Sequence, residues 1–158
     1  YTAWNVSSCS NFSDMFAGAT KFNNGIPNDI ADQNNIGNPL KFTFKETGSV
    51  DCGYMFSGAQ VFNAPVYQWT NTGSINDMDL MFKNAYKFNQ EVRTWDVTGI
   101  FTGGSYTGMF RDATAFLASD TKWNTQNEKP GLDFWKSWTA YEVDGITYEP
   151  HLNTLALT

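Results

Sequence analysis

The chain has 158 residues, of which 41% are hydrophobic and only 16% are charged, and its net charge is -6 at pH 7. This length and apolar content predict one folded domain with a substantial core. The acidic balance and the scattered Lys and Arg residues argue against nucleic acid and anionic membrane as partners. No stretch approaches the roughly 20 apolar residues that cross a bilayer. The chain begins with Tyr1 rather than Met, so we expect a processed product or a piece of a longer protein.

One nine-residue motif, Met-Phe-x-x-Ala-x-x-Phe followed by Asn or Leu, occurs four times along the chain. The copies begin at Met15, Met55, Met81 and Met109, at steps of 40, 26 and 28 residues. A step near 26 is typical of a solenoid, in which each repeat forms one coil and buries its apolar side against the next. The longer first step contains the Asn- and Pro-rich segment 27–39, which we expect to be an inserted surface loop.

The segments between the motifs predict the remaining elements of each coil. Tryptophan recurs with the motif, and Val66 and Val92 lie three residues before Trp69 and Trp95, which predicts a short strand ending at each ring. After the Trp, a capping box and one apolar helical face predict a helix of about three turns that contains the motif. The capping box consists of Ser74 and Asp77, and the apolar face consists of Ile75, Met78, Phe82 and Ala85.

Together these elements predict a single repeat domain over residues 1–158, of class α/β, built as a short solenoid of about four to five strand–helix coils. Coils are expected around residues 4–26, 40–69, 69–95 and 95–123, with a degenerate cap coil at 123–141. The cap coil is expected to differ in sequence because terminal repeats are atypical. Residues 141–158 are expected to form a hairpin, with Asp144-Gly145 as a type I′ turn, and a strand.

The whole pattern resembles the repeat of BspA-like leucine-rich-repeat surface proteins over roughly residues 4–141. The match is best at 69–95 and 95–123, where the pair Trp95-Asp96 has the place of the Trp-Asp that opens the family's repeat. The resemblance implies a leucine-rich-repeat-like solenoid in a cell-surface or adhesion setting. It supplies no catalytic residues.

The repeated Met and aromatic residues have two interpretations, a ligand site or a packing unit. Thioether sulfur favours Cu(I), and aromatic rings can stack on carbohydrate, but residues that recur once per coil are typical of a core. We therefore expect the Met, Phe and Ala of the motif to be buried. Tyr67 and Tyr106 lie outside the pattern and are candidates for an exposed contact surface, together with Glu91 and Arg93.

Neither a catalytic nor a metal site is predicted, and no cofactor is expected. His151 is the only histidine and lies in the C-terminal tail, and no Ser or Cys has the context of a nucleophile elbow. Residues 32–37 resemble a calcium loop but lack its closing Glu, which favours a solvated loop. Cys9 and Cys52 are expected to be buried free thiols, because their offset makes disulfide geometry marginal.

The function expected from these observations is non-catalytic. We expect an extracellular protein, on a cell or virion surface, that mediates adhesion or interaction with a protein or glycan. The alternative is a structural or decoration subunit of a larger assembly such as a virion, a fibre or a surface layer. In either case Trp4 and Phe12 mark the N-terminal end of the solenoid, which we expect to be covered by another segment or chain.

Overall fold

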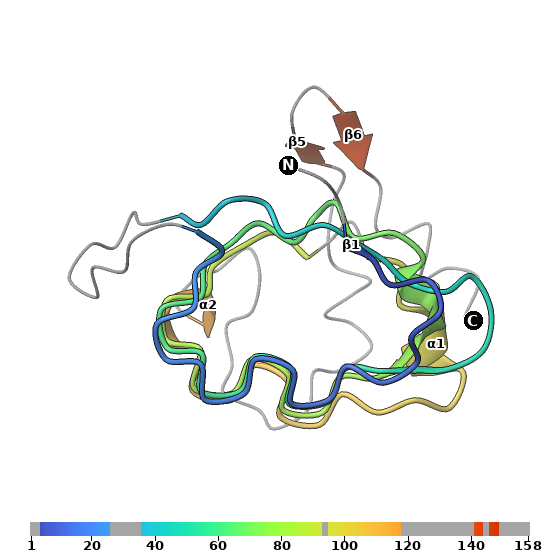
Figure 1. Ribbon diagram of the computed structural model, residues 1–158, viewed down its shortest axis with the longest axis horizontal. Coiled ribbons are helices and arrows are strands. Elements are labelled where there is room, and N and C mark those ends of the chain that lie inside the picture. Colours follow the sequence, from blue (N-terminus) through green and yellow to red (C-terminus); the bar gives the residue numbers. More distant parts are fainter. Residues whose placement is uncertain (1–3, 26–35, 93–94, 118–140, 144–145, 149–158) are drawn as a thin grey trace.

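A computed structural model of the protein describes residues 4–25, 36–92, 95–117, 141–143 and 146–148 (Figure 1). Its helices and strands are short, and most of the described chain consists of turns and extended segments. The elements, in chain order, are β1 (Trp4–Asn5), β2 (Phe42–Thr43), β3 (Val50–Asp51), η1 (Thr72–Ser74), β4 (Ile75–Asp77), α1 (Thr98–Phe101), α2 (Thr114–Leu117), β5 (Tyr141–Val143) and β6 (Ile146–Tyr148).

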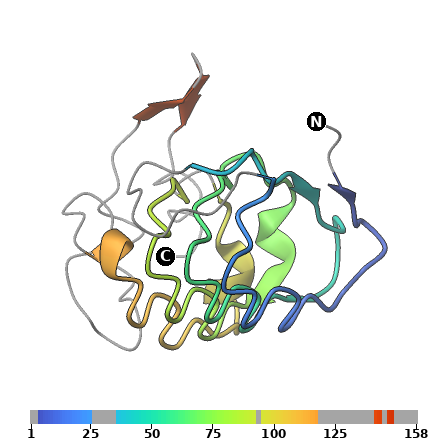
Figure 2. The ribbon, with the colours of Figure 1, turned by 60° about the vertical axis from the view of Figure 1, so that its left-hand side comes forward.

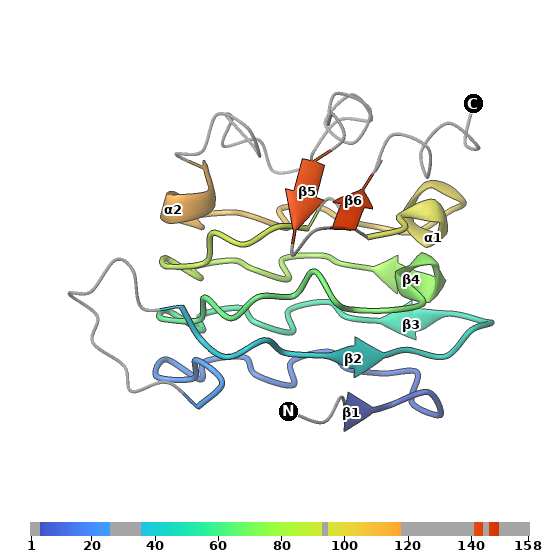
Figure 3. The ribbon, with the colours of Figure 1, turned by 90° about the horizontal axis from the view of Figure 1, so that it is seen from above.

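Successive copies of the repeat lie side by side as flattened coils, which superimpose in Figure 1 and form layers in Figure 3. Strand β1 pairs with β2 in parallel, with Trp4 opposite Phe42, and β3 pairs with β4 in the same sense. Isolated parallel bridges join further coils, at Thr43–Thr70 and at Asp77–Ser105. Parallel pairing follows from the repeat, because each coil returns to the same place one layer further on.

Backbone hydrogen bonds join the motif segments of neighbouring coils at alternate residues. In the interface between the second and third copies, Tyr54 N–H donates to the Asp79 carbonyl at 2.8 Å, and Phe56 N–H donates to the Met81 carbonyl at 2.9 Å. Four such bonds connect each pair of adjacent motif copies, always from a donor in one coil to an acceptor in the next. The motif therefore forms the hydrogen-bonded interface between coils.

In copies one to three the motif residues form consecutive turns, and in the fourth copy only the one-turn helix α2 (Thr114–Leu117) is helical, so the prediction of a three-turn helix over the motif is wrong for the described copies. The N–H groups between these inter-coil donors bond the carbonyl three residues earlier, as in Met81 to Met78 and Lys83 to Leu80, and the chain zigzags along one side of the stack (Figure 2). A left-handed residue before the Met and another three residues after it interrupt any helix; in the third copy these are Leu80 (φ 53°) and Asn84 (φ 57°). The capping-box residues Ser74 and Asp77, which were predicted to begin this helix, lie instead in η1 and β4.

The core is a set of aromatic columns that run through the stack. The two motif Phe rings stack within a coil, as Phe82 does on Phe88 with centroids 4.0 Å apart, and each also stacks on its equivalent in the next coil. In copies two to four the motif Met, Phe and Ala residues are buried, as the repeat predicts. The first copy differs, because the Met15 side chain is 41% exposed and Phe16 and Ala19 are only half-buried.

The Asn that follows the motif forms a second connection between coils. The Asn23 Oδ1 atom accepts a hydrogen bond from Asn63 N–H at 2.8 Å, and Asn63 Oδ1 accepts one from Asn89 N–H at 2.9 Å. Asn63 is 6% exposed, so its amide replaces the water that these backbone groups would otherwise bind. The fourth copy has Leu117 at this position, so the amide series cannot continue there.

At the C-terminal end, β5 and β6 pair antiparallel with Val143 opposite Ile146, which is the arrangement expected for a hairpin around Asp144-Gly145. Residues 144 and 145 themselves, the cap coil before Tyr141, the final strand and residues 27–35 of the inserted loop lie outside the described residues.

Candidate functional site

The four residues predicted to form a contact surface do not come together as one exposed patch. Tyr67 and Glu91 are half-buried, and Arg93 lies outside the described residues. Tyr106 is only 6% exposed, which corrects the prediction that it is an exposed contact. It lies three residues before Met109, the position that Met78 has before Met81, and is therefore a core position of the repeat.

The two residues predicted at the N-terminal end also differ from each other. Trp4 is 49% exposed, whereas Phe12 is 5% exposed, so Phe12 is not part of an open apolar end. The Phe12 ring packs edge-on against Phe44 with centroids 5.3 Å apart, because it has the same register position as Cys52 in the next coil. Of these two residues, only Trp4 presents its side chain at that end.

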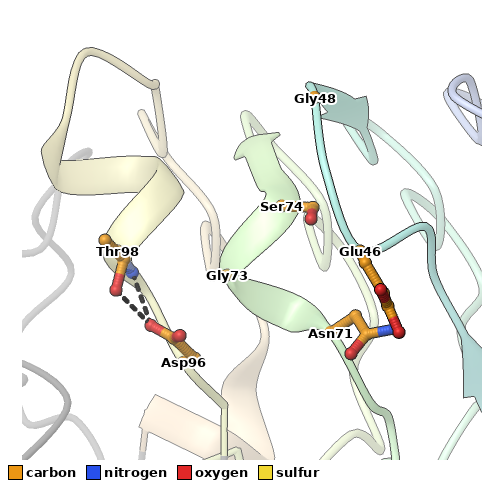
Figure 4. A pocket seen from close by; sticks show the side chains of 7 residues that line it. All are labelled: Glu46, Gly48, Asn71, Gly73, Ser74, Asp96 and Thr98. Carbon is orange, nitrogen blue, oxygen red and sulfur yellow. Dashed lines mark hydrogen bonds between the residues drawn. The ribbon is translucent and has the colours of Figure 1, made fainter.

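A pocket of about 380 Å³ lies at the corner that follows the Trp in each coil. Its lining comes from three successive coils, at residues 46–48, 71–74 and 96–98 (Figure 4). Every lining residue is polar or glycine: Glu46, Gly48, Asn71, Gly73, Ser74, Asp96 and Thr98. We call these seven residues the corner pocket.

Hydrogen bonds between coils hold the corner pocket in place. Asn71 has a left-handed backbone (φ 60°), and its Nδ2 donates to the Phe44 carbonyl at 2.9 Å. Ser74 Oγ donates to the Lys45 carbonyl at 2.8 Å. Each of these side chains satisfies a carbonyl of the preceding corner, so the pocket wall is fixed by the stacking itself.

Asp96 closes the pocket on its other side. One oxygen of its carboxylate accepts hydrogen bonds from both the backbone N–H and the hydroxyl of Thr98, and the Asp96 N–H donates to Thr72 Oγ1 at 2.8 Å. The second carboxylate oxygen lies only 2.6 Å from where a Cβ on Gly73 would be, so a side chain larger than hydrogen does not fit there. Glycine at 73 therefore allows the Asp96 carboxylate to lie against the preceding corner.

The corner pocket offers a partner mainly hydrogen-bond acceptors and hydroxyl groups. Glu46 and Asp96 are its only charged lining residues, and both are hydrogen-bond acceptors when ionised. Together with Asn71 and the hydroxyls of Ser74 and Thr98, they can bind hydroxyl, amide or ammonium donors.

The corner pocket was not predicted from the sequence, although the chain carries a partial signal for it. The dipeptide Thr-Gly occurs at 47–48, 72–73 and 98–99, at steps of 25 and 26 residues, and also at 102–103 and 107–108, which do not line the pocket. Glycine at these corners permits close approach of the neighbouring coil: a Cβ on Gly99 would lie 2.4 Å from the Ile75 carbonyl oxygen. A Thr-Gly that follows Phe42, Trp69 and Trp95 in three successive coils thus marks the place where the three corners meet.

A second polar cluster lies inside the stack, beside the motif. Asp51 and Asp77 are parallel neighbours in adjacent coils, and Asp77 Oδ1 accepts a hydrogen bond from Asp79 N–H at 2.8 Å. Burial raises the pKa of the Asp77 carboxyl, and the charges of Asp79 and Asp51 raise it further. Burial also raises the pKa of the Cys52 thiol, with Asp51 and Asp77 adding to the effect. These carboxylates accept backbone hydrogen bonds, so their role is structural.

Both cysteines are free, as expected, but only Cys52 is buried. Cys9 is exposed, which corrects the prediction of two buried thiols. Within the described residues there is no group of three or more His, Cys, Asp or Glu side chains placed to hold a metal ion. In the same part of the chain, no helix has the length and apolar character needed to cross a membrane.

The repeated coils, the aromatic columns and the polar corner define the class as a repeat protein. The chain matches the family described as "Mycoplasma protein of unknown function, DUF285" over residues 1–49 and 42–144, and it belongs to that family. The match is compatible with the resemblance to BspA-like surface repeat proteins. Neither a curated protein nor a solved structure matches the chain.

Proposed function

We propose that the protein is a non-catalytic recognition module, displayed outside the cell on a cell or virion surface, that binds a protein or glycan partner. We further propose that its stacked coils form a solenoid, which serves as the rigid support of the binding surface. The observation that carries the proposal is the corner pocket, in which polar side chains from three successive coils converge on one concave site.

The distribution of residues between core and surface supports this proposal. The motif Phe rings and Met side chains of copies two to four are buried in the core, where they stabilise the stack. What the corners present to a partner is mostly neutral and polar, with acceptor oxygens on Glu46 and Asp96. Such a surface favours ligands rich in hydroxyl, amide or ammonium donors, which include glycans and lysine-bearing protein segments.

The experiment is a binding screen of the purified chain on a glycan array and on immobilised extracellular-matrix proteins. For any ligand found, Glu46→Gln should weaken binding several-fold, because it replaces an exposed charged acceptor of the pocket with a neutral amide. Asp112→Asn is the matched control. It also removes one exposed carboxylate, but it lies two residues before α2, at the far end of the coil from α1 (Figure 1). Equal affinity of both variants and the parent chain would exclude the corner pocket as the site.

A structural role in a larger assembly is the second candidate, and one observation favours it. The outer edge of the first coil has exposed apolar side chains and carbonyls that accept no hydrogen bond from the described residues, which is a surface suited to association.

A further inference from the structure

One row of backbone carbonyls accepts hydrogen bonds in the second, third and fourth coils. In the first coil the same row accepts none from the described residues. In the second coil the carbonyls at the equivalent positions, Asp51, Gly53, Met55 and Ser57, each accept an N–H from the coil before. The third and fourth coils repeat the same row of four acceptors. In the first coil these carbonyls receive no hydrogen bond from any part of the chain that the structure describes. We call them the edge row: Asn11, Ser13, Met15 and Ala17.

Apolar side chains next to the edge row are exposed where their equivalents are buried. Trp4 is 49% exposed, whereas Trp69, its equivalent two layers further on, is 4% exposed. Met15 is 41% exposed, whereas Met55 has no exposed surface. Phe16 is half-buried, although its ring continues the column with Phe56 at 5.2 Å. These differences correspond to the surface that each later coil buries against the coil before it.

The polarity of the edge row restricts what can cover it. All its groups accept hydrogen bonds, so the partner has to supply main-chain N–H donors at alternate residues. The edge row of a second copy consists of carbonyls as well, so two edge rows cannot pair with each other by two-fold symmetry. An unrelated extended strand can donate N–H groups, but it does not have the Phe side chains that continue the columns at the right spacing.

We propose that the edge row and the exposed Trp4 and Met15 side chains form a docking surface for a further coil of the Met-Phe-x-x-Ala-x-x-Phe repeat. That coil lies with its donor N–H groups towards the edge row and its two Phe rings on Phe16 and Phe22. The chain already contains three interfaces of this kind, and the first coil presents the acceptor carbonyls and the Phe rings of a fourth. The inference does not depend on the corner pocket or on any ligand of it.

The experiment adds a coil and measures whether the edge becomes covered. A copy of residues 69–94 is placed directly before Trp4, because Trp95 follows those residues in the natural order and Trp4 has the same place in the stack. The reporter is a thiol at the edge, introduced as Met15→Cys in a Cys9→Ser background. Cys52 stays silent because it is fully buried. In the control, the two Phe residues of the added copy alone are changed to Asp.

With the intact added coil, the thiol at position 15 should react with a thiol reagent at least ten-fold more slowly than in the parent, while the control coil gives no protection. An equal rate in all three proteins, with Cys52 still unreactive and the host therefore folded, would overturn the proposal. Protection of the parent thiol that grows with protein concentration, together with a doubled mass in solution, would also overturn it and assign the edge to a second copy.

Discussion

The indole rings of Trp69 and Trp95 lie parallel, with centroids 4.9 Å apart and an interplanar angle of 8°. Each ring also donates its Nε1–H to a carbonyl of the preceding coil: Trp69 to Leu40 at 2.9 Å and Trp95 to Val66 at 3.1 Å. The same residue thus fills the core and satisfies a buried backbone acceptor, which explains why Trp and no other aromatic residue ends both segments.

Replacing Trp95 by Phe should separate these two roles. The ring column survives in part, but the buried Val66 carbonyl loses its donor, and we expect a loss of about 1–3 kcal/mol in the free energy of unfolding. Chemical denaturation measures this loss. The control is Trp4→Phe, which changes an indole that is 49% exposed and should have a much smaller effect. Equal losses at the two positions would mean that the indole hydrogen bond contributes nothing.

The left-handed turn positions predict different effects for two substitutions at the same place in the repeat. Gly58 has φ +73°, and a Cβ there would meet the Gly18 backbone at 3.6 Å, an ordinary contact, so Gly58→Ala should cost about 1 kcal/mol through backbone strain alone. Asn84 has the equivalent position with φ 57°, and Asn84→Gly relieves strain there while adding chain entropy to the unfolded state. We expect it to be within about 0.5 kcal/mol of neutral. Thermal unfolding of both variants tests the pair, and a neutral Gly58→Ala would contradict the assignment.

The amide series predicts a large effect at Asn63. Its Oδ1 accepts hydrogen bonds from Asn89 N–H and from the Gln90 side chain, and the residue is almost fully buried. Asn63→Ala leaves these donors without their partner, and we expect a loss of about 1–3 kcal/mol. Gln60→Ala, a half-buried neighbour that contributes its backbone carbonyl to Lys87, should change stability by less than about 0.5 kcal/mol. Urea denaturation of both variants measures the two losses. Equal losses would mean that the Asn63 amide does not connect the coils.

The pH dependence of stability should contain a contribution from Asp77. Burial raises the pKa of this carboxyl above 3.8 in the folded protein, so the folded state binds the proton more tightly than the unfolded chain does. The contribution to stability is therefore present near pH 3.8 and is lost as the pH rises through the folded pKa. Asp77→Asn keeps an acceptor oxygen for Asp79 N–H and removes the charge.

The Asp77→Asn variant should then be more stable than the parent at pH 7, and the difference should shrink as the pH falls towards 3.8. Denaturation curves at several pH values measure it. Asp112→Asn is the control, because this exposed carboxylate lies apart from the buried cluster. A stability difference between Asp77→Asn and the parent that stays constant with pH would mean that the raised pKa of the Asp77 carboxyl is not its cause.

The sequence was sufficient to predict the period of the repeat and the residues of its core. The register of Met81, Phe82 and Ala85 identifies buried positions because any stacked coil has to bury the same residues in each layer. The conformation of those residues was not predictable in this way. Apolar residues at intervals of three and four fit one face of a helix, but they equally fit a chain of turns in which every third or fourth side chain points inwards.

A local signal separates these two conformations. The position three residues after the motif Met is occupied by Gly18, Gly58, Asn84 and Asp112, all residue types that tolerate the left-handed region. A surface helix has no reason to place such residues at one position in every repeat. The corner pocket was unpredictable for another reason: its residues come from three coils, and their meeting depends on the stacking distance between turns, which the spacing of apolar residues does not report.

The hydrogen bonds that join the motif rows of adjacent coils have one direction throughout the stack, so one period of the repeat can be gained or lost as a unit. An in-frame duplication or deletion of about one period leaves each remaining donor row facing an acceptor row, so no junction has to be redesigned. The 40-residue first step shows that a coil also accepts extra sequence between its motif and the next. Lineages that carry this repeat can therefore change the length of the protein by recombination while every surviving interface stays intact.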